Sequence, residues 1–113
     1  MQYALLIYAE PGHEDDLPEE ERAAARAGYE ALADDPRYVR GTRLGPAGTA
    51  TSVRVAGGRT LLTDGPFADT KEVLGGICLI EAADLGEAIE VAAGIPAARH
   101  RGVVEVRPLA AGR

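Results

Sequence analysis

The chain has 113 residues and a formal net charge of −6, and this length is typical of a single domain, which we expect to span residues 1–113. The acidic balance argues against a nucleic-acid partner, because phosphate binding needs a basic face. Cys78 is the one cysteine, so no disulfide can form within the chain, and no apolar run approaches the roughly 18 to 20 residues of a membrane span. With no basic leader segment after Met1, we expect a cytoplasmic protein without a membrane partner.

The first part of the chain has the pattern of a strand, a helix and a weaker strand. Residues 3–9 are a continuous apolar run, which indicates a strand covered on both faces, or covered on one face and buried at a dimer interface on the other. Pro18 opens a helix whose first turn holds three glutamates, a favourable placement at the positive end of the helix dipole. The helix ends at residues 34–36, and residues 38–44 form a weak strand. The apolar stripe of the helix is narrow: Ala25, Tyr29 and Leu32.

A hairpin and a second apolar strand come next. Residues 49–55 alternate in polarity, and residues 59–63 return as the partner strand after the turn signal Gly57-Gly58. Residues 74–82 are apolar, and two glycines near their start, Gly75 and Gly76, indicate a bulge or a close approach of another backbone.

The last part of the chain has the pattern of a helix followed by a strand. Asp84 with Glu87 three residues later is typical of a helix start, and the apolar positions that follow have helical spacing: Leu85, Ala88, Ile89 and Ala92. Pro96 ends this helix, and residues 102–109 form the last strand.

This order of elements predicts an α+β fold. Two helices on one face of an antiparallel sheet, with an extra hairpin, make a ferredoxin-like sandwich with an inserted hairpin. The opposite sheet face, with residues such as Leu6 and Ile80, then lacks a cover. A second subunit is the simplest cover, so we predict a homodimer that forms a dimeric α+β barrel.

The segment from Asp64 to Glu72 is the most distinctive stretch of the chain. It is longer than the roughly two to five residues of a plain connection between strands. A rigid Gly-Pro turn precedes Phe67, the one phenylalanine, and Lys71 is the one lysine beside eleven arginines. Two aspartates, a threonine and a glutamate lie around them. This density of titratable groups indicates either a binding site or an interface.

The same segment resembles the DGPF-domain branch of the YCII-related proteins. The resemblance rests on Asp64-Gly65-Pro66-Phe67, Thr70-Lys71-Glu72 and Gly75-Gly76. It extends along most of the chain, through residues 3–9, Ala50-Thr51 before Val53-Arg54, Glu87-Ala88-Ile89, Ile95-Pro96 and residues 104–108. Asp69 departs from the family pattern, which more often has glutamate there, and this shortens the carboxylate arm by one methylene.

The resemblance implies a dimeric ferredoxin-like α+β barrel with a cleft near the Asp64–Phe67 loop. It also implies a link to extracytoplasmic-function sigma factors, beside which DGPF proteins are often encoded, although most of these proteins have no established activity. The wider YCII group includes a dehydrochlorinase that acts on a chlorinated hydroxyquinol, and its members are suggested to use a His–Asp pair with the histidine in the first helix. Residues 22–32 of this chain hold no histidine, so that pair does not carry over.

Three residues of the segment are catalytic candidates, and each has a structural alternative. Asp64 either orients a ligand or acts as a general base, or else its carboxylate caps the turn. Lys71 and Glu72 either bind an anionic substrate and transfer a proton, or form an ion pair that holds the loop to a partner subunit. Phe67 either anchors the loop or stacks on a ligand, and Asp69 completes the candidate ligand-binding residues of this loop.

Two further candidates lie outside the segment. Arg107 in the last strand is a candidate partner of Glu72 or Asp64, either in a structural salt bridge or as an anion clamp. Tyr8 in the first strand completes the candidate ligand-binding residues, because a chain with so few histidines has to use carboxylates, its lysine or tyrosines for any catalysis.

The remaining titratable groups fit structural roles better. We expect His13, in an acidic loop, to be solvated rather than a metal ligand, because a metal site needs convergent ligands. His100 lies between two arginines and is expected at the surface, and Cys78 lies within an apolar strand and is expected to be an inert buried thiol. We therefore expect no metal and no cofactor.

Three functional hypotheses remain open, and they leave undecided whether the protein is an enzyme. The first is a small-molecule-binding or accessory protein without turnover of its own, with a small-molecule ligand and a sigma factor as candidate partners. The second is a small cofactor-independent enzyme of the lyase or isomerase type that acts on a polar aromatic or carbonyl compound. The third is a dimer in which the Asp64–Glu72 segment only stabilises the interface.

Overall fold

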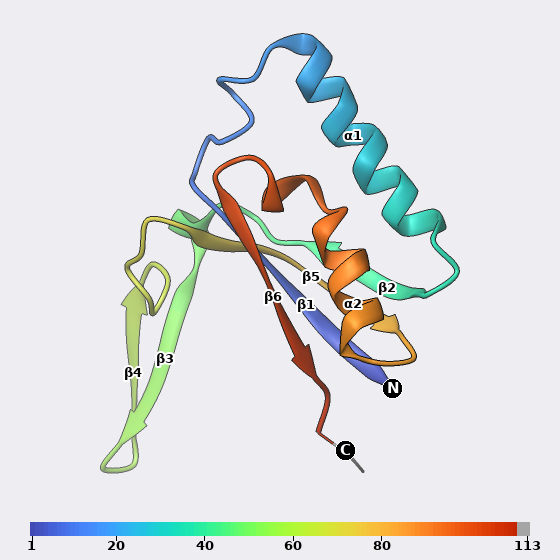
Figure 1. Cartoon of the computed structure of the whole chain (residues 1–113). Helices are drawn as coiled ribbons and strands as arrows, with labels where there is room; N and C mark the ends of the chain where they lie inside the picture. The colour runs from blue at the N-terminus through green and yellow to red at the C-terminus, as the bar shows by residue number, and fades with distance from the viewer. Residues whose placement is uncertain (111–113) are drawn as a thin grey trace.

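The computed structural model describes residues 1–110 (Figure 1), and the last three residues of the predicted domain, 111–113, lie outside the described residues. The elements of this part of the chain are β1 (Gln2–Ala9), α1 (Glu19–Asp34), β2 (Tyr38–Arg43), β3 (Thr51–Ala56), β4 (Arg59–Asp64), β5 (Val73–Glu81), α2 (Leu85–Ala93) and β6 (Gly102–Pro108), with 3₁₀ helices at η1 (Ala47–Thr49) and η2 (Pro96–Ala98). Each predicted element is present. The largest shift is at the start of the hairpin, where residue 49 belongs to η1 and not to a strand.

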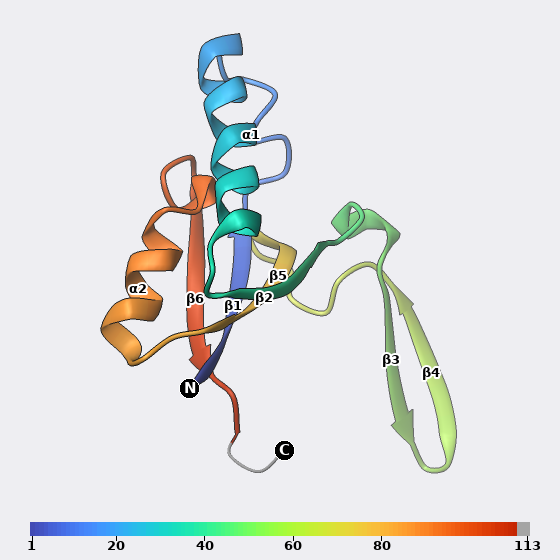
Figure 2. The ribbon, with the colours of Figure 1, turned by 90° about the vertical axis from the view of Figure 1, so that its right-hand side faces the viewer.

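Four of the strands form one antiparallel sheet in the order β2-β5-β1-β6, while β3 and β4 pair only with each other. Both helices lie on the same side of the four-stranded sheet (Figure 2). The α+β class and the antiparallel sheet with an inserted hairpin are therefore confirmed. Two strand–helix–strand units interleave in this order, as in the split βαβ arrangement.

The hydrophobic core lies on the helix-facing side of this sheet. Alternate residues of β1 point there, and Tyr3, Leu5 and Ala9 are buried. In β5 the residues opposite them, such as Cys78 and Ile80, are buried too. The core is completed by apolar residues of α2 and η2: Ala88, Val91, Ala92, Ile95 and Ala97.

The sequence-based placement of Ile80 on the open sheet face is wrong. Ile80 lies opposite Tyr3, whereas Leu6 lies opposite Ile77. Residues that face each other across an antiparallel pair project to the same side, so Ile80 points into the core and Ile77 joins Leu6 on the other side. We call this side the open face, and its apolar residues include Ala4, Leu6, Tyr8, Leu74, Ile77, Leu79 and Val103.

The two helices pack against the sheet to very different extents. At the start of α2, the Asp84 carboxylate accepts a hydrogen bond from the Glu87 backbone N–H at 2.9 Å, as the sequence predicts, and the helix buries one apolar face. Ala25 is the one buried residue of α1, because its apolar stripe is narrow. This helix lies close to η2 instead, where a Cβ on Gly28 would be 2.8 Å from Cγ of Pro96. Space therefore remains between α1 and the sheet.

Strands β3 and β4 project from the body as a hairpin arm, which we define as Thr51–Asp64 (Figures 1 and 2). Its turn is made by Gly57 and Gly58, whose φ angles of 56° and 75° are readily adopted only by glycine and are typical of tight hairpin turns. At its base, the Gly65 N–H donates a hydrogen bond to the Ala50 carbonyl at 2.7 Å. In Figure 2 the arm lies on the side of the sheet opposite the helices.

Candidate functional site

The space under α1 is a cavity of about 800 Å³, which we call the α1 cavity. Residues of α1, β2 and β5 and of the loop before α1 line it. Its apolar wall includes Ile7, Ala25, Leu32, Leu44 and Cys78. Binding sites for small molecules typically have a few hundred to about 1,000 Å³ and a largely apolar lining with a few polar groups. The α1 cavity has both properties.

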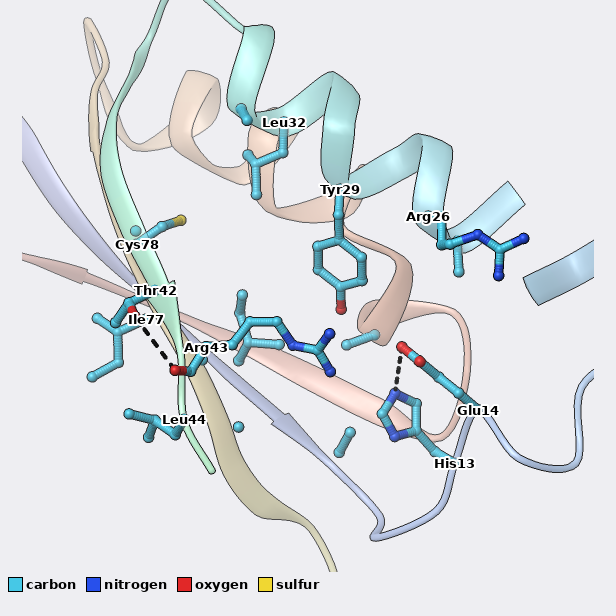
Figure 3. A pocket seen from close by; sticks show the side chains of 18 of the residues that line it. His13, Glu14, Arg26, Tyr29, Leu32, Thr42, Arg43, Leu44, Ile77 and Cys78 are labelled. Atoms are coloured by element: carbon cyan, nitrogen blue, oxygen red, sulfur yellow. Dashed lines mark hydrogen bonds and ion pairs between the residues drawn. The ribbon is translucent and has the colours of Figure 1, made fainter. Parts of the chain in front are cut away.

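The polar groups of the α1 cavity converge around Tyr29 (Figure 3). In this view the Tyr29 hydroxyl points down from α1 toward the guanidinium of Arg43, which reaches in from the end of β2. Burial raises the pKa of Tyr29, and the negative charge of Glu14 raises it further, while the Arg43 cation acts in the opposite direction. The hydroxyl is therefore a neutral hydrogen-bond donor at neutral pH, next to a positive charge.

Two arginines at this cavity keep hydrogen-bond donors unused. Within residues 1–110, the Arg43 side chain forms neither an ion pair nor a hydrogen bond with another residue. Arg22 also lines the cavity, and its Nε atom is buried without a hydrogen-bond partner, although its Nη2 donates to the Asp15 carbonyl at 3.1 Å. A charged donor without a partner is unfavourable, so an anion in the cavity would satisfy the guanidinium that Arg43 leaves unpaired.

A histidine and a glutamate from the loop before α1 lie at the same cavity. His13 Nε2 is 3.5 Å from Glu14 Oε1, and His13 Nδ1 is 3.1 Å from the Glu10 carbonyl oxygen. The expectation that His13 is solvated holds only in part, since its side chain is 21% exposed and lines the cavity. The loop folds back toward β1 and β6 because Arg101 donates to the His13 carbonyl and pairs with Asp16.

Cys78 lies in the wall of the cavity and is buried, as the sequence predicts. Burial raises the pKa of its thiol to about 11. Because the thiolate is the reactive form, the thiol is a poor nucleophile at neutral pH.

The first part of the sequence-predicted segment lies outside the α1 cavity, at the base of the hairpin arm. Asp64 ends β4, and Asp64, Phe67 and Asp69 are all exposed. Phe67 is 80% exposed, and its ring lies 5.4 Å from the Arg54 guanidinium carbon, a cation–π contact. The turn is fixed by other groups, since the Ser52 hydroxyl donates to the Gly65 carbonyl at 2.9 Å.

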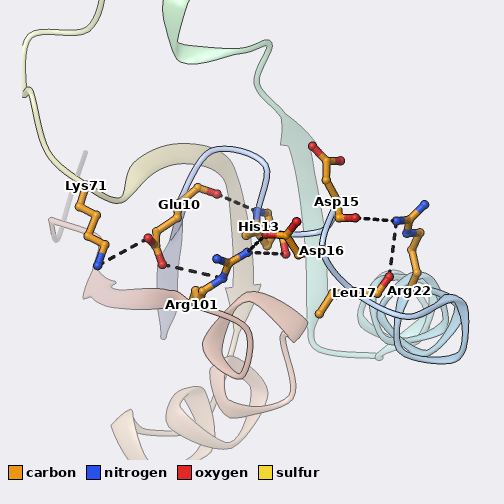
Figure 4. Close-up of polar contacts among 8 residues, drawn as sticks. All are labelled: Glu10, His13, Asp15, Asp16, Leu17, Arg22, Lys71 and Arg101. Atoms are coloured by element: carbon orange, nitrogen blue, oxygen red, sulfur yellow. Dashed lines mark hydrogen bonds and ion pairs between the residues drawn. The ribbon is translucent and has the colours of Figure 1, made fainter.

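The second part of the segment joins a network of charges beside β1 (Figure 4). Lys71 Nζ lies 3.6 Å from one oxygen of the Glu10 carboxylate, and Arg101 Nε lies 3.9 Å from the other. Glu72 is half-buried, and its carbonyl accepts a hydrogen bond from the Thr70 hydroxyl at 2.6 Å. Lys71 thus holds the segment to its own chain through Glu10.

The other two candidates lie on the sheet. Tyr8 is on the open face, opposite Val103, and does not line the α1 cavity. Arg107 Nε lies 3.6 Å from a Glu105 carboxylate oxygen in its own strand, and not next to Asp64 or Glu72. The structure therefore separates the sequence-predicted residues into three places: the arm base, the Glu10 network and the sheet.

The α1 cavity is lined by residues that sequence reasoning did not choose as site candidates: Tyr29, Arg43, Arg22, His13 and Glu14. The sequence does hold a signal for Tyr29. A tyrosine on the apolar stripe of a helix has a hydroxyl that needs a hydrogen-bond partner when it is buried. Arg43 had none, since one arginine among eleven carries no distinguishing pattern.

In residues 1–110, no three His, Cys, Asp or Glu side chains lie close enough together to hold a metal ion. The helices of the same part of the chain are too short or too polar to cross a membrane.

Comparison with known proteins identifies relatives over almost the whole chain. The family model described as the YCII-related domain matches residues 1–111. An uncharacterized protein of Rhizobium meliloti (strain 1021) is 36% identical over 117 residues, covering 97% of this chain and 93% of the relative.

Proposed function

Because the chain belongs to the YCII-related domain family, we propose that it is a homodimeric small-molecule-binding protein whose ligand occupies the α1 cavity. The ligand is a small organic anion with an apolar body, such as an aromatic carboxylate. The observation that carries this proposal is the pairing of a largely apolar cavity with an unpaired guanidinium at Arg43.

The chemistry of the cavity supports this ligand class. An apolar wall favours a hydrocarbon or aromatic body, because burying apolar surface is favourable by about 25 cal/mol per Å². Arg43 presents a planar set of donors that matches a carboxylate, and the Tyr29 hydroxyl supplies a further donor. The negative charge of Glu14 would repel the carboxylate of the ligand. We therefore place this carboxylate at Arg43 and the apolar body of the ligand toward Leu32 and Cys78.

The test compares carboxylates with their neutral analogues, beginning with benzoate and benzamide and continuing through a panel of such pairs. Carboxylates are expected to bind, as measured by NMR titration or calorimetry, and carboxamides to bind at least tenfold more weakly. Arg43→Gln should weaken carboxylate binding by about 10- to 100-fold, since a hydrogen bond to a charged group contributes about 1.5–3 kcal/mol. Equal binding of both members of every pair would contradict the anion site.

Two variants control for other effects of the substitution. Tyr29→Phe removes one neutral donor and should weaken carboxylate binding by only a few-fold. Arg59→Gln removes the same charge from the hairpin arm, outside the cavity, and should leave binding unchanged. A loss of affinity in Arg59→Gln equal to that in Arg43→Gln would indicate an effect of net charge rather than a site.

The homodimer is proposed from the open face. Its apolar residues are only partly covered by residues 1–110, and two such faces in contact would make the dimeric α+β barrel. We propose that Asp64, Phe67 and Asp69 belong to this interface rather than to the ligand site, because they are exposed at the base of an arm on the open side. Light scattering should give the mass of two chains at micromolar concentration.

A second function is favoured by the His13–Glu14 pair. Together with Tyr29 it gives the cavity an acid–base set, as a lyase or isomerase acting on a polar aromatic or carbonyl compound requires. If this second function holds, a metabolite screen should find a substrate whose turnover is lost in His13→Gln while benzoate still binds. Turnover that persists in His13→Gln would exclude this assignment.

The link to an extracytoplasmic-function sigma factor rests on the family resemblance and is proposed on that ground alone. If a sigma factor is encoded next to this protein, co-purification of the two should recover a complex. Failure to recover it at micromolar concentrations of both proteins would remove the link.

A further inference from the structure

We infer that the hairpin arm is an intermolecular clasp: each chain extends Thr51–Asp64 over the open side of a second copy and packs the apolar face of the arm against it. This inference rests on the proposed homodimer and adds to it a named contact surface, because the arm is separate from the sheet whose open face defines that dimer.

The surface of the single chain is too large for its mass. A compact monomer of 11.8 kDa is expected to expose about 5,900 Å². This chain exposes 7722 Å², an excess of about 1,800 Å² over that expectation. Its radius of gyration is 15.9 Å, whereas about 13 Å is expected for a compact domain of this length.

An excess of this size matches a stable dimer. Standard interfaces bury roughly 800 Å² on each partner, and obligate homodimers bury roughly 1,000–2,500 Å². Covering the excess surface of one chain with a second copy would therefore give an interface in the obligate range.

The arm holds much of the exposed apolar surface and has an uncovered apolar face. Val53 lies directly opposite Leu62 in the hairpin, and Val55 follows two residues later on the same side. Val53, Val55 and Leu62 are 62%, 69% and 68% exposed. An isolated two-stranded hairpin is marginally stable at best in water, so an arm of this composition needs another surface to pack against.

The position of the arm favours a second copy as that surface. The arm and the open face lie on the same side of the sheet, away from both helices (Figure 2). A second copy that covers the open face would therefore also contact the arm. Two-fold symmetry lets both chains give and receive an arm.

The test places a charge in the apolar face of the arm. Leu62→Asp should raise the dimer dissociation constant at least about 100-fold, as measured by sedimentation equilibrium, because a charge would be buried without a partner. Val53→Asp should do the same. Ile89→Asp is the matched control, since Ile89 is 52% exposed on the helix side and its substitution should leave the dissociation constant unchanged.

A deletion separates the arm from the rest of the interface. Because the Gly65 N–H bonds to the Ala50 carbonyl, Thr51–Asp64 can be replaced by a two-residue Asn-Gly turn between these residues. The shortened chain should keep its helical circular dichroism and its benzoate binding but dissociate at the concentrations where the intact chain is a dimer.

The outcomes distinguish the clasp from the proposals on which it rests. An intact chain that is monomeric at micromolar concentration overturns both the dimer and the clasp, while leaving the ligand site to its own test. A dimer whose dissociation constant is unaffected by Leu62→Asp, Val53→Asp and the deletion overturns the clasp alone. Equal weakening by Ile89→Asp also overturns it.

Discussion

The two faces of the four-stranded sheet differ in how completely the chain covers them. On the helix side, Leu5 and Ile80 are fully buried beneath α2 and η2, and the α1 cavity has a largely apolar lining with a few polar groups. On the open side, Leu6 and Ile77 are only partly buried and lie on the same side of the sheet as the hairpin arm. The difference shows that the helix-side face forms the core of the chain, whereas the open face is the one that we propose for contact between chains.

The largest expected effect is on the free energy of unfolding, when one large side chain on each face of the sheet is truncated to alanine. Ile80→Ala should lower the free energy of unfolding by about 2–5 kcal/mol, independently of protein concentration, because it leaves a cavity in the core. Leu6→Ala should have a smaller effect that grows with protein concentration, because Leu6 contributes mainly after association. Urea unfolding at two concentrations measures both.

If Ile80→Ala does not fold, Ile80→Val gives the same comparison at about 0.5–1.5 kcal/mol. A concentration dependence for the Ile80 variants, or its absence for Leu6→Ala, would contradict the division of roles between the two faces.

The next effect concerns how α1 is held over its cavity. A Cβ on Gly28 would lie 2.8 Å from Cγ of Pro96, so Gly28→Ala should displace α1 from η2 and destabilise the protein by about 1–3 kcal/mol despite the better helix propensity of alanine. Gly48→Ala, where no atom lies within 4 Å of the added Cβ, is the control and should be nearly neutral. Thermal unfolding of both variants tests the contact.

A third effect concerns the reactivity of the cavity wall. Burial raises the pKa of Cys78 to about 11, so alkylation of the folded protein at pH 8 should be at least tenfold slower than that of the urea-unfolded chain. A cysteine at the exposed Glu90, in a Cys78→Ala background, should react at the rate of a free thiol. Equal rates at the two positions would show that the wall opens readily to solvent.

The smallest expected effect is a change in acid stability caused by the Asp35–Arg37 pair after the end of α1. Hydrogen bonds from Arg37 lower the pKa of Asp35 from 3.8 to about 2. A lowered pKa in the folded state stabilises the protein above pH 4, and this contribution is lost as the pH falls from about 4 to 2. Asp35→Asn should therefore flatten the decline in stability over that interval, as measured by acid unfolding. An unchanged slope would contradict a role for this pair.

Sequence patterns predict most of this fold because local chemistry determines where its elements begin and end. Asp84 begins α2 by capping it, and Gly57-Gly58 turns the hairpin. The face on which Ile80 lies depends on strand register, and register is set by contacts between residues far apart in sequence.

The candidate site was predicted less well for a related reason. The cavity arises because α1 stands away from the sheet, and its residues come from separate segments that meet only in three dimensions: His13, Tyr29 and Arg43. The Asp64–Glu72 segment identified the family instead, since its residues are contiguous and their pattern is visible in one stretch of sequence.

The hydrogen bond between Gly65 and Ala50 has a consequence for how this chain can vary. Because the two ends of the arm meet there, the arm is an insertion with a closed base, and the four-stranded body is continuous without it. If the arm clasps a second copy as we propose, changes in its length or composition would alter how two chains associate while the residues that line the α1 cavity stay in place.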